Sequence, residues 1–344
     1  NYCIDPGQKP YQQICERLGL PCYGSKEQFD IMTNKDLFKK ACIEDDVGVI
    51  PEINLDNMRE VDLPIVIKPA DGRASKGTTF CFSGSEISNA VSIALTYSSR
   101  KRIVAEKFIS GQEVVVKYFV CNGEIALTSM ADLFTCYTRD GKRAYIIAQV
   151  FPSQYYQFYR QTTDYKVRNM IRNIGIKNGP LSFDGFVDGD EFRFFDPSFR
   201  MGGAQDWRIV AAITGIDISD LLTNFALTGE MGDCHSIRQI DGKFAEESSA
   251  MLYFLVREGT IGKIIGLSEA LKVPSVIGYH MSHVESDVVR HFGTSDHVVM
   301  RLLLVCDSRE QLREDIIRIQ SLISIVNDQG ENMLLPNFDA GLIV

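Results

Sequence analysis

The sequence FRFFDPSFRMGG, residues 192–203, places polar residues at every second position within an aromatic run that ends in two glycines. On a β-strand, side chains two residues apart point to the same face. One face therefore carries Asp196, Ser198 and Arg200. An edge strand with a solvated polar face is one interpretation, and Pro197 fits it because proline cannot donate to a ladder. A strand that presents a functional set of side chains is the other interpretation, and the upstream sequence favours it.

The preceding residues predict a β-hairpin over 183–199, with Asp184 on its first strand. Asp184 and Asp196 lie on one face of the hairpin only if the residue numbers of directly opposed residues add up to an even number. A three-residue connection at 189–191 gives that register, whereas a regular two-residue turn places the two carboxylates on opposite faces. We therefore predict a three-residue loop or a bulged ladder, with both carboxylates and Arg200 facing a cleft that holds Lys68.

Composition limits the class of protein. The chain has 344 residues, of which 45% are hydrophobic and 24% charged, as in soluble globular proteins of two or three domains. The net charge of −9 argues against a nucleic-acid or anionic-membrane surface. Nine cysteines occur without a CxxC pair, which predicts reduced, mostly buried thiols in a cytoplasmic protein.

Helices and strands are predicted to alternate in an α+β order. A helix followed by a short strand is expected at 11–25, and a helix capped by Thr33 or Asn34 at 33–46. A buried strand at 64–70 precedes a Gly/Ser/Thr loop. The other expected elements are helices at 86–98, 154–174, 204–229 and 308–323, and strands at 102–109, 112–132, 144–151, 249–257, 262–267, 274–279 and 296–305, with a hairpin turn at 122–123.

Several motifs occur in the order known from one enzyme superfamily. Lys35 stands in the capped helix, Lys68 lies in the strand VIKP just before the glycine loop, EKFISGQE spans 106–113, and DPSFRMGG spans 196–203. In these motifs the chain resembles the ATP-grasp superfamily over about residues 15–330. It is most similar to the carbamoyl-phosphate-synthetase-like and L-amino-acid-ligase branch, because 308–326 resembles the closing helix of that branch.

The resemblance implies an ATP-grasp fold, in which two α+β subdomains close on ATP. Members of this branch usually carry a small Rossmann-like domain first, so we expect the N-terminal domain to be missing or truncated. The implied divisions are 1–26 as a remnant of that domain, 27–60 as a helical linker, 61–110 as the small lid subdomain, 111–235 as the large subdomain with the metal site, and 236–344 as a C-terminal α+β subdomain.

The resemblance also implies an ATP site. Its lysines would supply positive charge to the phosphates, and the loop amides would cover them. Glu113 would accept the ribose hydroxyls, and the backbone of 107–109 would meet the adenine edge. Lys39 and Lys40 lie close to Lys35, so the choice among these three lysines is open. The implied ATP-binding residues are Lys35, Lys68, Ser75, Gly77, Thr78, Glu106, Lys107, Ile109 and Glu113.

Magnesium, with Mn²⁺ as an alternative, is implied at Asp184, Asp196 and Ser198, since phosphoryl transfer depends on positioning and charge neutralisation. Arg200 would act as the catalytic cation for the transferred phosphate or the substrate carboxylate. Most family members have Glu and Asn where this chain has Asp196 and Ser198. Two hypotheses follow: a ligase that makes an acyl-phosphate for attack by an amine or ammonia, or a catalytically weakened nucleotide-binding module or regulatory subunit.

No motif in the sequence identifies the substrate-binding residues. Arg139, Lys142 and Arg208 are candidates for binding an anionic carboxylate, with solvated loop cations as the alternative. The five histidines are too loosely spaced for a metal site. The expected partners are small-molecule carboxylate and amine or ammonia substrates, with no nucleic acid and no membrane, and a homodimer is left open.

Overall fold

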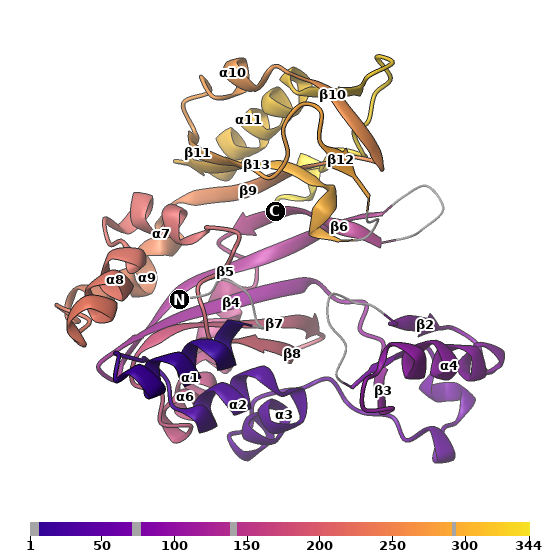
Figure 1. Cartoon of the computed structure of the whole chain (residues 1–344), viewed down its shortest axis with the longest axis vertical. Coiled ribbons are helices and arrows are strands. Elements are labelled where there is room, and N and C mark those ends of the chain that lie inside the picture. Colours follow the sequence, from indigo (N-terminus) through magenta and orange to yellow (C-terminus); the bar gives the residue numbers. More distant parts are fainter. Residues whose placement is uncertain (1–6, 71–76, 138–142, 291–293) are drawn as a thin grey trace.

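The computed structural model describes residues 7–70, 77–137, 143–290 and 294–344. Its main feature is an antiparallel eight-stranded sheet in the order β11-β13-β9-β6-β5-β4-β7-β8, which runs through the whole molecule (Figure 1). The strands are β4 (Glu113–Cys121), β5 (Glu124–Tyr137), β6 (Arg143–Phe151), β7 (Gly179–Asp188), β8 (Glu191–Ser198), β9 (Ser248–Leu255), β11 (Val276–Met281) and β13 (Val298–Cys306).

Helices cover the two ends of this sheet. α1, α2 and α3 gather near β7 and β8, whereas α11 packs against β9 and β13 (Figure 1). The α-helices are α1 (Gln8–Leu18), α2 (Lys26–Thr33), α3 (Lys35–Glu44), α4 (Ile87–Tyr97), α5 (Tyr156–Thr162), α6 (Asp164–Asn173), α7 (Trp207–Thr214), α8 (Ile218–Thr228), α9 (Ile240–Lys243), α10 (Leu267–Ala270) and α11 (Arg309–Leu322).

A separate three-stranded sheet, β2-β1-β3, packs on α4. Its strands are β1 (Ile65–Pro69), β2 (Thr79–Cys81) and β3 (Ile103–Lys107). This unit, called the small sheet below, has its own core of six buried residues and lies beside the large sheet in Figure 1. A third sheet joins β10 (Gly259–Ile265), β12 (Val288–Val289) and β14 (Ser324–Asn327).

Most expected elements are present, with two corrections. No strand follows α1, because residues 21–25 have no ladder partner; instead Tyr23 is buried and donates a hydrogen bond to the carbonyl of Phe199 at 3.0 Å. The helix expected at 154–174 is interrupted at Thr163 and forms α5 and α6. The cap of α3 is Asn34, whose side chain accepts from two backbone amides.

The β7–β8 hairpin confirms the predicted bulged ladder. Its turn contains two residues, and the register shifts between Asp184 and Gly185. Gly185 pairs with Phe194 and Asp184 pairs with Asp196, so Phe195 is the extra residue. A bulge of this kind re-aims a side chain without lengthening the turn. The three-residue loop offered as the alternative does not occur.

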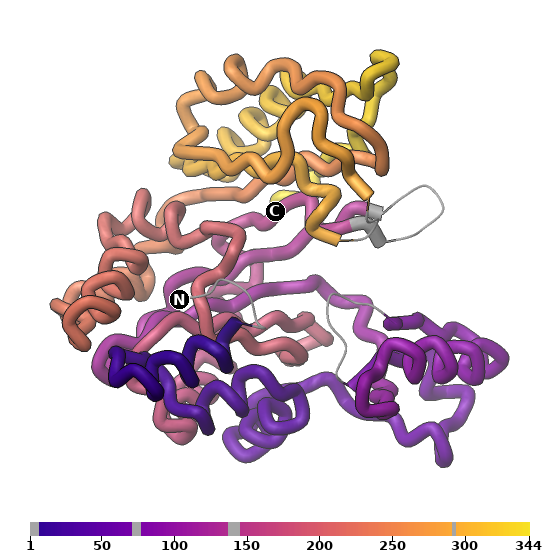
Figure 2. Tube along the Cα trace, viewed as in Figure 1, coloured from indigo at the N-terminus to yellow at the C-terminus, as the bar shows by residue number. Residues whose placement is uncertain are grey.

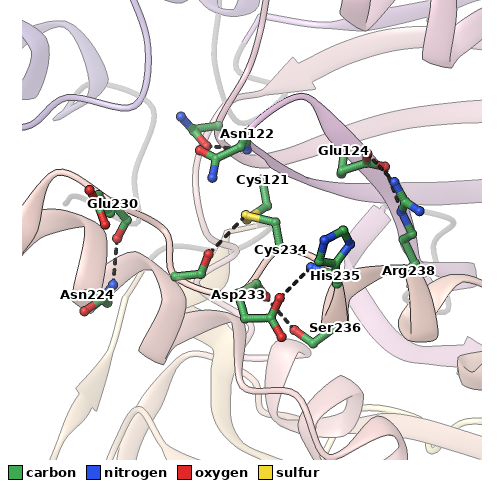
Figure 3. The surroundings of a disulfide bond; sticks show 12 residues. Cys121, Asn122, Glu124, Asn224, Glu230, Asp233, Cys234, His235, Ser236 and Arg238 are labelled. Carbon is green, nitrogen blue, oxygen red and sulfur yellow. Dashed lines mark hydrogen bonds and ion pairs between the residues drawn. A yellow bond between two sulfur atoms is a disulfide. The ribbon is translucent and has the colours of Figure 1, made fainter.

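A disulfide joins Cys121, at the end of β4, to Cys234 (Figure 3). The expectation that all thiols are reduced is therefore wrong for this pair. The two residues are 113 positions apart, so no local spacing announces them, but the fold brings their Cα atoms to 5.4 Å. This separation is normal for a disulfide. The six other cysteines in the described ranges are free, and five are buried.

Within the described residues, no single helix has the length and hydropathy to cross a membrane, although α7 and α8, bent by 106° at their junction, pass that test as a pair.

Candidate functional site

Three carboxylates lie on one face of the large sheet. Asp184 and Asp196 are direct cross-strand partners, and Val115 of β4 is the partner of Asp184 on its other side. Glu113 lies two residues before Val115, so its side chain is on the same face. The fold thus brings the two predicted metal-binding carboxylates together and adds Glu113 beside them.

The electrostatics of Asp184 reflect this grouping. Burial raises the pKa of the Asp184 carboxyl to about 7, and the negative charges of Asp196 and Glu113 add to the rise. Lys117 and Arg200 act in the opposite direction but do not cancel it. A cation bound beside these three carboxylates would stabilise the ionised form of Asp184.

The donor set fits a hard cation. Asp184 and Asp196 offer carboxylate oxygens, and Ser198, at the end of β8, lies across from Ser182 on the same strand pair. In the part of the chain that the structure describes, no group of three or more His, Cys, Asp or Glu side chains is arranged to hold a metal ion. A Mg²⁺ ion here would therefore need phosphate or water oxygens as well, which is its usual coordination at nucleotide sites.

Lys35, the first residue of α3, reaches this carboxylate pair. Its ammonium lies 3.4 Å from the carboxylate of Asp196, which remains about half exposed. The lysine chosen from the sequence is therefore beside the predicted metal site. An ion pair at this exposure contributes little to stability, so it is easily exchanged for a ligand.

Glu106 of β3 lies between two lysines. The ammonium of Lys39 is 2.6 Å from one of its oxygens and that of Lys68 is 2.5 Å from the other. Glu106 is only 3% exposed. Burial by itself raises the pKa of Glu106, but Lys68 and Lys39 outweigh it and hold the pKa below its usual value.

Lys68 is also placed over the bulge. Its ammonium lies 5.9 Å from the centre of the Phe195 ring, and that ring stacks on Phe186 at 5.2 Å. Burial lowers the pKa of Lys68, and the charges of Lys35 and Lys39 add to this effect against Glu106. The bulge therefore places the Phe195 ring beside Lys68 and the Asp196 carboxylate beside Lys35.

The segment after β8, residues 199–206, links the carboxylates to α7, and Figure 2 shows it passing beside the large sheet to that helix. Its end is fixed by Asp206, whose carboxylate is 2.6 Å from the ammonium of Lys117. Both side chains are largely buried. The segment thus holds Arg200 next to the face that carries Asp184, consistent with the influence of Arg200 on the Asp184 pKa.

The other residues predicted to bind ATP lie before β2 and at the end of β3. Gly77 and Thr78 are partly buried and directly precede β2. Gly77 has φ of +75°, and a Cβ there would lie 2.8 Å from that of Tyr97, so the position favours glycine. The Lys107 amide donates to the carbonyl of Pro51 at 3.0 Å, while its side chain lies 3.3 Å from Asp188.

Ile109 is buried, at 6% exposure. Ser75, Arg139 and Lys142 lie outside the described residues, so the structure places none of them. Arg208 of α7 lies away from the carboxylates, where its guanidinium donates to the carbonyl of Tyr279 at 3.4 Å.

Two residues of this site were not selected from the sequence. Lys39 forms the buried ion pair with Glu106, and its position four residues after Lys35, on the same helical face, was the available signal. Lys117 lies two residues beyond Val115 and so faces the carboxylates. In the sequence, only its place in the alternation of an apolar strand indicated that it could belong to the site.

No protein-family model matches the chain. Three D-alanine–D-alanine ligases match parts of it: that of Clostridium beijerinckii is 32% identical over 112 residues, covering 30% of this chain and 36% of the relative. Ligase A of Bacillus cereus is 23% identical over 162 residues, covering 44% and 46%, and ligase B of Clostridium perfringens is 30% identical over 92 residues, covering 26% and 29%. The chain thus spans less than half the length of the curated relatives it matches.

Solved structures match over a much larger share of the fold. An L-amino acid ligase from Bacillus licheniformis superposes with a TM-score of 0.76 at 19% identity, covering 94% of this chain and 79% of that one. A phosphoribosylglycinamide synthetase from Anaerococcus prevotii gives a TM-score of 0.72 at 16% identity, covering 94% and 81%. Together with the ligase matches, this fold assigns the chain to the ATP-grasp superfamily.

Proposed function

We propose that this chain is an ATP-dependent ligase that activates a carboxylate as an acyl-phosphate for attack by an amine or ammonia. The observation that carries the proposal is the direct pairing of Asp184 with Asp196, beside Lys35 and near Arg200. Similarity to D-alanine–D-alanine ligases and to an L-amino acid ligase fold supports the same general reaction.

Each group has a role in this proposal. Lys68 and Lys35 bind the phosphates of ATP, and Glu113 accepts the ribose hydroxyls. Asp184 and Asp196 would hold Mg²⁺, which would neutralise charge on the transferred phosphoryl group. Arg200 binds the acyl-phosphate oxygens as a fixed cation. The L-amino-acid-ligase branch is proposed because α11 corresponds to the closing helix expected from 308–326.

A nucleotide-binding module without turnover is the second candidate. Ser198 favours it, since a hydroxyl is a weaker metal ligand than an amide oxygen.

Thermal shift and phosphate release together test the proposal. We expect ATP or ADP with Mg²⁺ to raise the melting temperature more than GTP does, and Lys68→Ala to remove most of that shift. We also expect phosphate release from ATP that depends on both a carboxylate pool and an amine pool. A nucleotide shift without any substrate-dependent release would favour the module, and indifference to every nucleotide would refute both.

A further inference from the structure

Glu106 is a buried carboxylate with one lysine at each of its oxygens. The ammonium of Lys39 donates to Oε1 at 2.6 Å, and that of Lys68 donates to Oε2 at 2.5 Å. Because Glu106 is only 3% exposed, water does little to stabilise its charge, and the two lysines must do so. They come from different units: Lys39 lies on α3, which packs against β8 of the large sheet, whereas Lys68 lies on β1 of the small sheet.

The two lysines differ in their other partners. Lys39 also donates to Glu52 at 2.8 Å, whereas in the described part of the chain no second carboxylate lies within ion-pair distance of Lys68. Burial lowers the pKa of each ammonium. At Lys39 the charges of Glu106 and Glu52 outweigh burial and raise the pKa, but the pKa of Lys68 remains lowered. Lys39 is therefore the more firmly held partner of Glu106.

The two lysines also approach Glu106 from opposite edges of β3. Strand β1, which carries Lys68, runs along one edge, and Glu52 forms an isolated bridge with Glu106 at the other. On its own side, the Lys68 ammonium lies 5.9 Å from the centre of the Phe195 ring, one residue before the carboxylate of Asp196. A phosphate that meets Lys68 there leaves the contact between Lys39 and Glu106 in place.

A phosphate at Lys68 competes with Glu106 for the same ammonium. If Lys68 were the only cation at Glu106, its departure would leave a buried carboxylate without a partner, which is strongly unfavourable. With Lys39 at Oε1, the carboxylate stays paired when Lys68 turns to the phosphate. The cost of the exchange is therefore reduced before any nucleotide binds.

From this arrangement we propose that Lys39 is a positioning residue for nucleotide binding, which neutralises Glu106 so that Lys68 can exchange Glu106 for a phosphate of ATP. Lys39 acts through Glu106 and does not itself contact the nucleotide. The inference rests on the proposed role of Lys68 in ATP binding, but it is measured with ADP and without turnover.

Calorimetry of the full chain with ADP and Mg²⁺ tests this exchange in the wild type, Lys39→Met, Glu106→Gln and the double variant. We expect Lys39→Met to weaken ADP binding at least about tenfold, because Glu106 then retains Lys68. The double variant should bind ADP within about threefold of Glu106→Gln, since a neutral amide does not retain the lysine. Lys40→Met is the matched control, because Lys40 is exposed on the same helix, and it should bind as the wild type does.

The affinities are compared at a temperature at which circular dichroism shows every variant to be folded, so loss of the fold does not enter them. If Lys39 only stabilised the fold, folded Lys39→Met would bind ADP as tightly as the wild type. That result overturns the inference. A double variant that binds as weakly as Lys39→Met overturns it as well.

Lysine side-chain NMR of the wild type provides a measurement that does not depend on the folding of Lys39→Met. On addition of ADP with Mg²⁺, the Nζ signal of Lys68 should shift, whereas that of Lys39 should stay in place. Lys68→Arg and Lys39→Arg assign the two signals. A Lys68 signal that does not respond to bound ADP, or a Lys39 signal that shifts more than that of Lys68, contradicts the exchange.

The outcomes for the two proposals are separable. ADP binding that depends on Lys39 in the predicted pattern, without substrate-dependent phosphate release, leaves the role of Lys39 standing and refutes the ligase. Substrate-dependent phosphate release by Lys39→Met with the wild-type KM for ATP keeps the ligase and refutes the role of Lys39. Absence of ADP binding by the wild type refutes both.

Discussion

Lys39 and Lys40 are neighbours in α3, yet they differ in their surroundings. Lys39 bonds to Glu106 and to Glu52 and is largely buried. Lys40 is exposed and lies 3.8 Å from Glu44 one turn away. The sequence could not separate these lysines, because helical periodicity gives a face but not the partner that faces it.

Replacement of Lys39 by Met should lower the free energy of unfolding by about 2 kcal/mol, because it leaves buried Glu106 with Lys68 alone. Replacement of Lys40 by Met should change it by less than about 0.5 kcal/mol. Urea denaturation of the two variants measures the difference. Equal effects would show that the Lys39–Glu106 contact is not formed in solution.

Asp184 should make stability depend on pH in the absence of metal. Its pKa is raised to about 7 when folded, whereas an unfolded aspartate titrates near about 4. Between these values the folded state binds the proton more tightly, so this contribution to stability is present at low pH and is lost as pH rises through 7.

As the pH rises from about 4 to about 7, the interval between the two pKa values, ionisation of Asp184 should therefore lower the melting temperature of the metal-free protein. Asp184→Asn should remove that component. Asp190→Asn, in the exposed hairpin turn, serves as the control and should keep it. A pH profile that is the same in wild type and Asp184→Asn would contradict the raised pKa.

At the scale of elements, the β7–β8 hairpin depends on its bulge. In a regular ladder after the two-residue turn, Phe195 would oppose Asp184 and Asp196 would turn to the other face. The alternation of side chains along a strand was enough to predict that a regular two-residue hairpin would separate Asp184 from Asp196. The sequence could not decide between a longer turn and a bulge, because each places both carboxylates on one face.

One alanine inserted between Phe195 and Asp196 should abolish the Mg²⁺ dependence of nucleotide stabilisation, because it turns Asp196 away from Asp184. A glycine inserted between Gly189 and Asp190 lies outside the ladder and should preserve that dependence. Thermal shifts with ADP, with and without Mg²⁺, measure both. Equal Mg²⁺ responses in the two variants would argue against metal binding by this pair.

The disulfide connects the end of β4 with the segment before α9. Closing so long a loop should stabilise the oxidised protein, and we expect Cys234→Ser to lower the free energy of unfolding by about 2–4 kcal/mol. In the presence of a reducing agent, wild type and variant should become equal. Mass spectrometry under non-reducing conditions identifies the bond, and free thiols at both positions would refute it.

At the scale of the molecule, the motifs of 196–203 and 106–113 predicted the carboxylates of the large sheet and the fold class. Contacts between distant strands escaped the sequence: Gln149 donates to the Tyr253 hydroxyl at 2.9 Å, and Tyr253 is the cross-strand partner of Arg301. Such groups meet only through register, which no local spacing encodes. Cys121 and Cys234 were missed for the same reason.

Among the described residues, the small sheet shares no strand ladder with the large one, and six buried residues form its core. Segments with so few buried contacts open more often than the global fold does. Amide hydrogens of β1 and β3 should therefore exchange with solvent faster than those of β4 and β7. Bound nucleotide should slow exchange in β1 and β3, because Lys68 and Glu106 lie on those strands. Hydrogen–deuterium exchange in the small sheet would thus report nucleotide occupancy.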